Sequence, residues 1–398
     1  MRKIVIAIMA LWAFTGCDVA EIADPNAWTS SQKTEFLEIL ENDKYASICN
    51  QQALYAQTKE SQSSKQLLQL LVAYSKNLAN GCLNVRHSND YAVYKQIVNP
   101  QNIALQIKAG QNIESILKPY VPRYRQFSAL ITYYKTLDAK TALAIKVRKN
   151  IERIKVMKTD IGTNYALINI PEFMVRIIES DKEAVKMAVV VGKKHQATPV
   201  FASELKYITL NPQWSVPDSI ARNEIIPKLL RNPNYLTARR MVVRKSYNLA
   251  SPKIAVSSVD WKKYKGGKGY VPYKFIEVPS RRNGLGRVKF IFPNKHSVYM
   301  HDTQSKGLFK RKVRTFSHGC VRLHKPKTML NYIATHYTVH SQKTVKNWYD
   351  KMKTKHLNLN KKLTVHTSYL TTYIDDAGLL INTSDIYGFD KKQKLNFN

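Results

Sequence analysis

The sequence predicts an α+β fold in which a helical region precedes a mostly β domain that carries a long insertion. Apolar residues recur at helical spacing between Trp28 and about Asn150. From about Thr159 they alternate or run together between Pro, Gly and Asp turns, as in β-strands. This strand pattern is interrupted from Pro217 to Gly286. A chain of 398 residues with 44% hydrophobic residues suits about two domains.

The N-terminal helices are marked by apolar stripes and by residues that begin or end a helix. Ser30 or Ser31 is expected to cap the first helix, and prolines separate the later ones. We expect the stripes to form a helical core rather than a binding groove. The positions concerned are Leu37, Leu40, Ile48, Leu67, Leu68, Leu71, Val72 and Leu78, with Pro100, Pro119 and Pro122 between helices.

The β region and its insertion are predicted segment by segment. Pro217 to Gly286 is expected to be an ordered insertion that acts as a lid, with the Gly266–Gly269 stretch as its hinge; a long solvated loop is the alternative. A helix is expected after Cys320, begun by Pro326. The expected strands are 166–170, 174–178, 188–191, 207–210 and 363–374, and the expected helices are 220–230 and 325–336.

One short motif combines the groups that cysteine chemistry needs. His301 is followed after a basic stretch by Ser317-His318-Gly319-Cys320-Val321-Arg322. Cysteine hydrolases and transferases require a nucleophilic sulfur, a base, backbone donors for an oxyanion and a cation for an anionic substrate. A free thiol is only a few per cent thiolate at neutral pH, so a neighbouring imidazole is expected to activate Cys320.

The spacing around the motif adds detail. Tyr299 and His301 are two apart, so they face the same side of a strand. Gly319 allows a tight turn directly before Cys320 and leaves nearby amides unobstructed. The alternative is a buried structural thiol with surface histidines, but the ordered set favours catalysis.

At these residues the sequence resembles the L,D-transpeptidases of peptidoglycan synthesis, the YkuD family. The family pattern is a His, a gap of about fifteen to twenty residues, and then a motif that Ser317 to Arg322 fills here. Further segments resemble the large periplasmic branch typified by YcbB, and the likeness covers about residues 150 to 390. These segments are 165–171, 191–193, 198–201, 211–217, 285–290 and 384–388.

The resemblance implies a mechanism and a set of roles. Cys320 would attack a tetrapeptide stem, release D-Ala and pass the acyl group to an amine, forming a 3→3 crosslink. His301 would be the general base, oriented by the backbone carbonyl of Asp302. Amides of Gly319 and Cys320 would form the oxyanion hole, and His318 would shape the cleft. Arg322 would bind a stem carboxylate or brace its own loop; Tyr299 and Trp214 would be cleft walls or core aromatics, and Ser317 would contact substrate.

The first residues resemble a bacterial export signal. Arg2 and Lys3 precede an apolar run too short to span a bilayer. Gly16-Cys17 resembles a lipobox, which predicts lipidation of Cys17; an ordinary cleaved signal is the alternative. Asp18 resembles an inner-membrane retention signal. We therefore expect a periplasmic, membrane-anchored lipoprotein.

Export affects how the four cysteines are interpreted. With Cys17 lipidated and Cys320 catalytic, Cys49 and Cys82 remain, and they form a disulfide or stay as two buried thiols. The sequence contains no clustered Cys and His ligand set, so we expect no metal and no cofactor.

The chain is strongly basic, with a formal net charge of +35 from 63 Lys+Arg and 28 Asp+Glu. Its positive residues are scattered rather than gathered on a nucleic-acid motif, so we expect no nucleic-acid partner. A basic surface suits anionic lipid headgroups and the carboxylates of peptide stems. The expected partners are donor and acceptor stems, the membrane through the lipid anchor, and carbapenem-type inhibitors.

These expectations divide the chain into a signal peptide (1–16), a helical scaffold (17–150), a catalytic domain (151–345, with its capping insertion at about 217–286) and a C-terminal tail (346–398) that completes the catalytic domain. The protein is predicted to be a transferase of peptidoglycan synthesis, which would serve cell-wall biogenesis and the maintenance of cell shape. An L,D-carboxypeptidase or crosslink-cleaving hydrolase would use the same cysteine. A non-catalytic murein-binding scaffold is the alternative from a different class.

Overall fold

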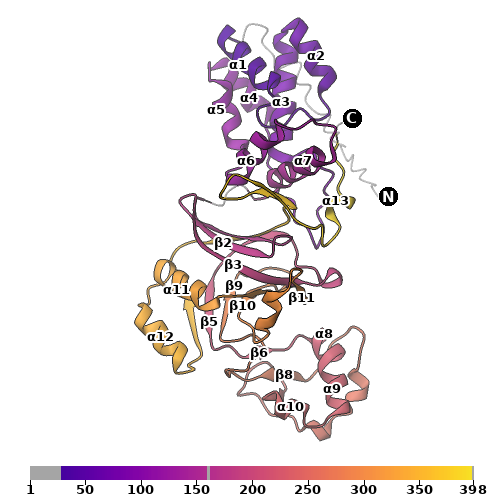
Figure 1. Cartoon of the computed structure of the whole chain (residues 1–398), viewed down its shortest axis with the longest axis vertical. Helices are drawn as coiled ribbons and strands as arrows, with labels where there is room; N and C mark the ends of the chain where they lie inside the picture. Colours follow the sequence, from indigo (N-terminus) through magenta and orange to yellow (C-terminus); the bar gives the residue numbers. More distant parts are fainter. Residues whose placement is uncertain (1–27, 159–161, 397–398) are drawn as a thin grey trace, which may run out of the picture.

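The structure is a computed structural model that describes residues 28–158 and 162–396. The predicted signal peptide, Cys17 and Asp18 lie outside the described residues. Figure 1 shows three parts along the long axis: a bundle of helices, a curled β-sheet in the middle, and the insertion at the far end. The α+β class predicted from the sequence is confirmed. No helix among the described residues is long and apolar enough to cross a membrane.

The helical part packs around its own core. Phe36, Leu71 and Ile151 are fully buried there, so the apolar stripes do form a core. Thr29 caps the first helix in a capping box with Gln32, so the expectation that Ser30 or Ser31 does so is wrong. The helices are α1 (Ser30–Glu41), α2 (Gln52–Ser61), α3 (Ser64–Asn80), α4 (Pro100–Lys108), α5 (Ile113–Leu117), α6 (Arg125–Tyr134) and α7 (Ala142–Lys155).

A disulfide and a buried ion cluster fasten these helices together. Cys49 and Cys82 are joined in a disulfide with Cα atoms 6.0 Å apart, which settles the pairing that the sequence left open. Beside it, the buried carboxylate of Glu152 accepts from Arg148 Nε at 2.7 Å and from Lys155 Nζ at 3.0 Å. The cluster leaves each of these buried charges with an opposite charge.

The central sheet has eleven strands among the described residues, in the order β13-β5-β9-β10-β12-β3-β2-β1-β14-β4, with β11 beside β3. Strand β1 is buried on both faces, because Ala166 and Ile168 join the central core while Tyr165 and Leu167 pack against the helices. The strands are β1 (Tyr165–Asn169), β2 (Met174–Glu179), β3 (Lys182–Gly192), β4 (Phe201–Glu204), β5 (Tyr207–Leu210), β9 (Val288–Ile291), β10 (Met300–His301), β11 (Thr315–Ser317), β12 (Val321–Leu323), β13 (Lys355–Asn358) and β14 (Thr364–Ser368).

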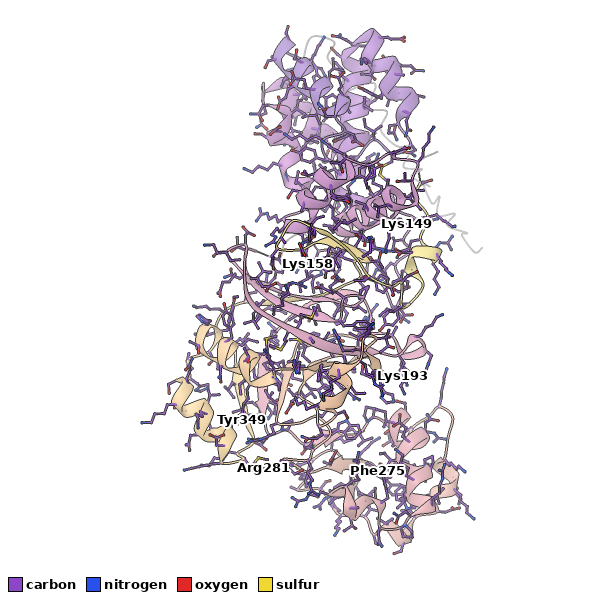
Figure 2. The ribbon with its side chains drawn as sticks, in the orientation of Figure 1. Lys149, Lys158, Lys193, Phe275, Arg281 and Tyr349 are labelled. Carbon is purple, nitrogen blue, oxygen red and sulfur yellow. A yellow bond between two sulfur atoms is a disulfide. The ribbon has the colours of Figure 1, made fainter. Side chains whose placement is uncertain are left out.

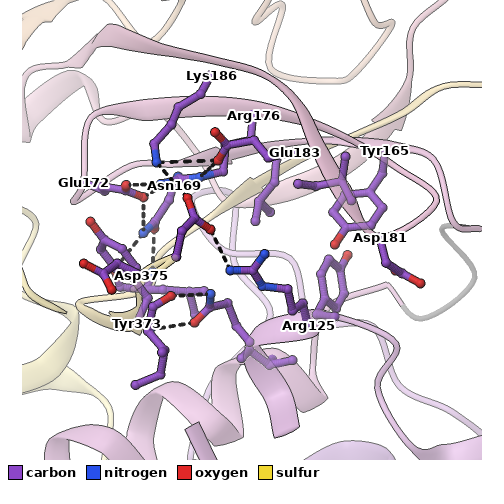
Figure 3. Close-up of a pocket in the computed structure, with 18 of the residues that line it drawn as sticks. Arg125, Tyr165, Asn169, Glu172, Arg176, Asp181, Glu183, Lys186, Tyr373 and Asp375 are labelled. Carbon is purple, nitrogen blue, oxygen red and sulfur yellow. Dashed lines mark hydrogen bonds and ion pairs between the residues drawn. The ribbon is translucent and has the colours of Figure 1, made fainter. Parts of the chain in front are cut away.

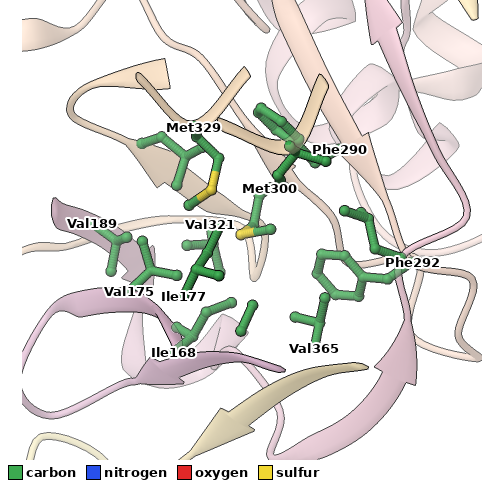
Figure 4. Close-up of a cluster of buried hydrophobic side chains, with 14 of the residues drawn as sticks. Ile168, Val175, Ile177, Val189, Phe290, Phe292, Met300, Val321, Met329 and Val365 are labelled. Carbon is green, nitrogen blue, oxygen red and sulfur yellow. The ribbon is translucent and has the colours of Figure 1, made fainter. Parts of the chain in front are cut away.

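The central core lies on one face of this sheet, where helices cover it. Figure 4 shows Met300, Val321 and Phe290 from neighbouring strands converging on Met329 of α11. Because one face of β9, β10 and β12 packs into this core, side chains that do not belong to the core lie on the opposite, outer face of these strands. The covering helices are α11 (Pro326–Tyr337) and α12 (Gln342–Asp350).

The predicted strand 363–374 is wrong as a single element. Its first half is β14 in the central sheet, and its second half, β15 (Thr372–Ile374), pairs with β16 (Leu380–Asn382) in a separate two-stranded sheet. The backbone leaves the central sheet between them, where Leu370 packs into the helical core. The chain then returns along the helices, and Lys149 donates to the carbonyl of Asp390 at 2.6 Å in the region labelled in Figure 2. Helix α13 (Phe389–Lys392) lies there.

The insertion folds around a core of its own. Trp261 packs against Phe275, with ring centroids 5.1 Å apart, and Figure 2 marks Phe275 inside the insertion. The predicted helix 220–230 is divided into three pieces by a π-helical turn at Ala221–Ile225. The elements are β6 (Trp214–Ser215), α8 (Asp218–Ile220), η4 (Ala221–Ile225), α9 (Ile226–Arg231), α10 (Tyr235–Ala238), β7 (Met241–Arg244) and β8 (Lys274–Glu277).

The glycine-rich stretch is held inside this insertion. Gly266 exchanges hydrogen bonds with Arg222, and Asn223 donates to the carbonyl of Gly267 at 3.1 Å. These glycines therefore brace the π-helical turn. Their role as the hinge of a lid stays a prediction.

A pocket lies where the helices meet the sheet. Figure 3 shows its side chains, and several of the charged ones pair with one another: Arg125 with Asp376 at 2.7 Å, and Arg176 with Glu183 at 2.9 Å. Tyr165 contributes to its apolar wall. Because these charges already have protein partners, the pocket is best described as part of the junction between the two parts.

Candidate active site

Strands β10 and β12 bring the two halves of the motif together. They pair in parallel, with Met300 opposite Val321 and His301 opposite Arg322. Met300 and Val321 lie in the central core, and side chains alternate along a strand, so His301 and Arg322 face the other side. Cys320 directly precedes Val321 and belongs to that same outer face.

Strand β9 adds a lysine to this face. It pairs antiparallel with β10, with Lys289 opposite His301 and Phe290 opposite Met300. The ammonium of Lys289 lies over the ring of Tyr299, 3.8 Å from its centroid, and Tyr299 is in turn a neighbour of the Cys320 sulfur. The sheet thus gathers thiol, imidazole, phenol and ammonium on one surface.

The loop before the sulfur is shaped by Gly319. Its φ of +106° is a conformation that side chains disfavour, so a glycine is required for this turn. Its N–H donates to Ser317 Oγ at 3.2 Å, which leaves the amide of Cys320 as the better-placed oxyanion donor of the two expected. Ser317 is buried and also accepts from Lys193 N at 3.0 Å, so it supports the loop.

A hydrogen-bond network clamps the same loop from behind. Thr198 Oγ1 donates to the carbonyl of Gly319 at 2.7 Å and accepts from Gly192 N at 2.9 Å. The hydroxyl of Tyr387, near the C-terminus, donates to the carbonyl of Gly192 at 2.7 Å. Three segments that resembled the family without a stated role therefore meet here to position the motif.

The orientation of His301 is fixed by the backbone. Its Nδ1 donates to the carbonyl of Asp302, as expected, so Nε2 carries the lone pair. The Asp302 carboxylate is held by Thr303 N and Lys306 Nζ, both at 2.7 Å. Gly286 packs so closely that a Cβ there would lie 2.3 Å from Asp302 Cγ, so this turn also depends on a glycine.

The electrostatic setting keeps His301 neutral. Burial lowers the pKa of its imidazole to about 3, with Arg322 and Lys289 acting in the same direction and the carbonyls of Asp302 and Leu285 opposing them. A neutral imidazole can accept a proton, but it carries no positive charge. No hydrogen bond joins His301 to Cys320 in the described part of the chain, where the sulfur lies 3.8 Å from the carbonyl of Ser297.

The thiol of Cys320 experiences opposing influences. Burial raises its pKa, while Tyr299, Lys289 and Arg322 pull it down. The cysteine is partly exposed at the surface. The hydrogen bonds from Tyr299 and the two cations therefore favour the thiolate, whereas desolvation of the sulfur disfavours it.

The insertion reaches this surface through one acidic residue. The carboxylate of Glu224, in the π-helical turn, lies against Nε2 of His318 within hydrogen-bond distance, and its charge also acts on Arg322. Arg322 Nε is buried and has no hydrogen-bond partner among the described residues. Trp214 lies in the small sheet of the insertion beside Gly284, and its role as a cleft wall stays a prediction.

Two residues of the site were not predicted from the sequence. Lys289 lies in a segment recognised by resemblance, but only the pairing of β9 with β10 shows that it faces the sulfur. Glu224 belongs to the insertion, about ninety-four positions before His318. No sequence signal pointed to it, because the contact depends on how the insertion packs.

One group of residues elsewhere has metal-ligand spacing. The sulfurs of Cys49 and Cys82 and the carboxylate of Glu152 lie within 4.8 Å of one another. The sulfurs are joined in the disulfide, and the carboxylate is bound by Arg148 and Lys155. These partners use the donor atoms that a metal ion would need.

The comparisons with known proteins concern the region that contains this site. Residues 163–346 match the family model YkuD, the L,D-transpeptidase catalytic domain. These residues form a YkuD-family domain. The chain is 27% identical over 275 residues to a Haemophilus influenzae protein named "Putative L,D-transpeptidase", which covers 68% of this chain and 53% of the relative. The chain thus spans about half the length of that curated relative.

Two solved structures are more distantly similar to this chain. An L,D-transpeptidase from Mycobacterium smegmatis is 12% identical, with a TM-score of 0.22, over 51% of this chain and 58% of that one. The Ldtfm–avibactam carbamoyl enzyme is 10% identical, with a TM-score of 0.26, over 76% and 81%. Neither superposition is close enough to assign residues, so the roles within this YkuD domain rest on its own geometry.

Proposed function

We propose that this protein is an L,D-transpeptidase that forms 3→3 peptidoglycan crosslinks through a thioester on Cys320. The observation that carries the proposal is the shared outer face of β10 and β12, on which His301, Tyr299, Cys320 and Arg322 lie together. The YkuD domain supplies the general reaction class. The choice of stem, acceptor and crosslink is the part that we propose.

The proposed reaction has two acyl-transfer steps. The Cys320 thiolate attacks the carbonyl between diaminopimelate and the terminal D-Ala; the C–N bond breaks, and D-Ala leaves with a proton. The side-chain amine of a second diaminopimelate then attacks the thioester. It loses a proton to the base, the new amide forms and the C–S bond breaks, which restores Cys320. No oxidant or reductant is needed.

The residues support these steps in different ways. Nε2 of His301, the ring nitrogen that does not donate to the Asp302 carbonyl, is the proposed proton acceptor. The Cys320 amide is the proposed oxyanion donor. Arg322 is the proposed partner for a stem carboxylate, since its Nε is buried without a hydrogen bond in the described structure. His318 is proposed to connect the insertion to the site through Glu224 rather than to touch the reacting atoms.

The cellular setting is part of the proposal. We propose export, lipidation of Cys17 and retention at the inner membrane from the resemblance of the N-terminal residues to a lipobox, and membership of the YcbB-like branch from the resembling segments. The disulfide between Cys49 and Cys82 supports an oxidising compartment such as the periplasm. Carbapenem-type inhibitors are expected to acylate Cys320, because that step resembles attack on the donor stem.

Muropeptide mass spectrometry tests this function. Purified protein is incubated with tetrapeptide-rich sacculi, and we expect 3→3 dimers and free D-Ala. Tripeptides without dimers would assign an L,D-carboxypeptidase, and loss of existing crosslinks would assign a hydrolase. Unchanged sacculi would favour the non-catalytic scaffold. Cys320→Ala is the matched control, because it removes the sulfur and leaves the surface otherwise intact.

A further inference from the structure

Lys289 has an unusual environment for a lysine. It is partly buried on β9, and burial lowers the pKa of its ammonium. In the part of the chain that the structure describes, it forms no ion pair with a carboxylate; its ring contact is with Tyr299, at 3.8 Å. The opposing charge that acts on it is the thiolate form of Cys320. A desolvated cation without an acidic partner is costly to keep, which suggests a function.

The other charged groups near the sulfur cannot replace this lysine. The His301 imidazole is neutral, so it offers no positive charge to a thiolate. Arg322 is positive, but two negative groups act on its charge: the Cys320 thiolate and the carboxylate of Glu224 from the insertion. Tyr299 contributes a hydroxyl beside the sulfur without a net charge. Lys289 is therefore a cation on this face for which the Cys320 thiolate, rather than a carboxylate, is the opposing charge.

We propose that Lys289 is a positioning residue for the nucleophile: its ammonium, held over the Tyr299 ring, stabilises the Cys320 thiolate electrostatically. This role rests on the proposed function only in taking Cys320 as the nucleophile. It goes beyond the pairing of cysteine and histidine in the motif, because Lys289 carries its charge before the thiol proton moves, whereas His301 is neutral until it accepts that proton. The thiolate then has a permanent cation near it in addition to the imidazolium that forms on His301.

Alkylation of Cys320 tests the proposal without any substrate. The rate of modification by iodoacetamide is followed from pH 5 to 11 by mass spectrometry of the peptide that contains Cys320. For Lys289→Met we expect the rate at pH 7 to fall about tenfold, because an opposite charge nearby typically changes a thiol's ionisation by that order. The two rates should approach each other at high pH, where the thiol is ionised in both proteins.

Two further variants make the result specific. Lys289→Arg keeps the charge and should stay within about threefold of the wild type at pH 7. Lys182→Met removes an exposed lysine at the start of β3, eight residues or roughly 26 Å along the strand from Val190, and should leave the profile unchanged. Thermal unfolding of each variant shows whether it is folded.

The outcomes separate this proposal from the proposed function. A wild-type profile for folded Lys289→Met, or a rate lowered equally at every pH, would overturn the role of Lys289. An unchanged profile with weaker binding of stem peptide would assign the lysine to substrate recognition instead. If Cys320→Ala still formed crosslinks, the proposed function would fail even where the alkylation profile behaved as expected.

Discussion

Two regions of this protein bury cations, and they treat them differently. In the helical part, Arg148 and Lys155 flank the carboxylate of Glu152, next to the disulfide. On the outer face of the sheet, Lys289 lies near a thiol, which is neutral until it loses a proton. Burial lowers the pKa of both lysines, to about 8 for Lys155. The Glu152 carboxylate is a permanent anion, so the helical cluster is suited to a structural role. The Cys320 thiolate forms only when the thiol loses its proton, so the site around Lys289 is suited to catalysis.

The largest expected effect is at the sulfur. Cys320→Ala should abolish acylation by a carbapenem, because the variant retains no nucleophile at this position. Its stability should change by less than about 1 kcal/mol, since the side chain is small and partly exposed. Intact-mass spectrometry measures acylation by the carbapenem, and urea unfolding measures the change in stability. A drug adduct on the variant would show that another residue is the nucleophile.

The helical cluster should respond in the opposite way. Glu152→Gln removes the anion between two buried cations and should lower the free energy of unfolding by about 3 to 5 kcal/mol. Alkylation of Cys320 in the folded fraction should not change. Glu60→Gln, at an exposed position of α2, is the matched control and should cost less than about 0.5 kcal/mol. If Glu152→Gln lowered the free energy of unfolding no more than Glu60→Gln does, the buried cluster would contribute little to stability.

The features of the fold and the site that depend on residues close together in the chain were predicted from the sequence. Strand 207–210 was placed at its observed bounds, and the orientation of His301 by Asp302 followed from adjacent residues. Period-two alternation and a six-residue motif are local signals, so they survive without knowledge of the packing. The α+β class followed from the change of period near Thr159.

Other parts could not be predicted because they depend on contacts between distant segments. Lys289 faces the sulfur only through the register of β9 against β10. Strand 363–374 is divided because Leu370 packs into a core built by the helices. The Cys49–Cys82 pairing stayed open because spacing alone does not bring two thiols together. Each of these features is set by tertiary packing.

The two histidines should differ in their effect on the nucleophile. His301→Ala should slow carbapenem acylation by on the order of a hundredfold or more, as expected for loss of a general base. His318→Ala should have a smaller effect, because its imidazole pairs with Glu224. Acylation rates measured by stopped flow or by mass spectrometry show which of the two variants is slower. A larger loss in His318→Ala would reverse the two assignments.

The neutral state of His301 makes a related prediction about pH. Its folded pKa of about 3 lies below the usual 6.5, so the imidazole keeps its lone pair as the pH falls through 6.5 and becomes protonated only near pH 3. The wild-type acylation rate should therefore rise with pH along the ionisation of the thiol, without an inflection near 6.5. Such an inflection, if it disappeared in His301→Ala, would show that the imidazole is not held neutral by burial.

The smallest expected effect is at the contact between the insertion and the site, where the carboxylate of Glu224 meets His318. Glu224→Gln removes the carboxylate that contacts His318, and a partly exposed contact of this kind is worth about 0.2 to 1 kcal/mol, or up to about fivefold. If the insertion excludes water from the thioester, weaker contact should raise the ratio of tripeptide to 3→3 dimer by about two- to fivefold while acylation stays unchanged. Glu204→Gln, on β4 at one end of the strand order, is the control. An unchanged product ratio in Glu224→Gln would show that the insertion does not decide between water and amine through this contact.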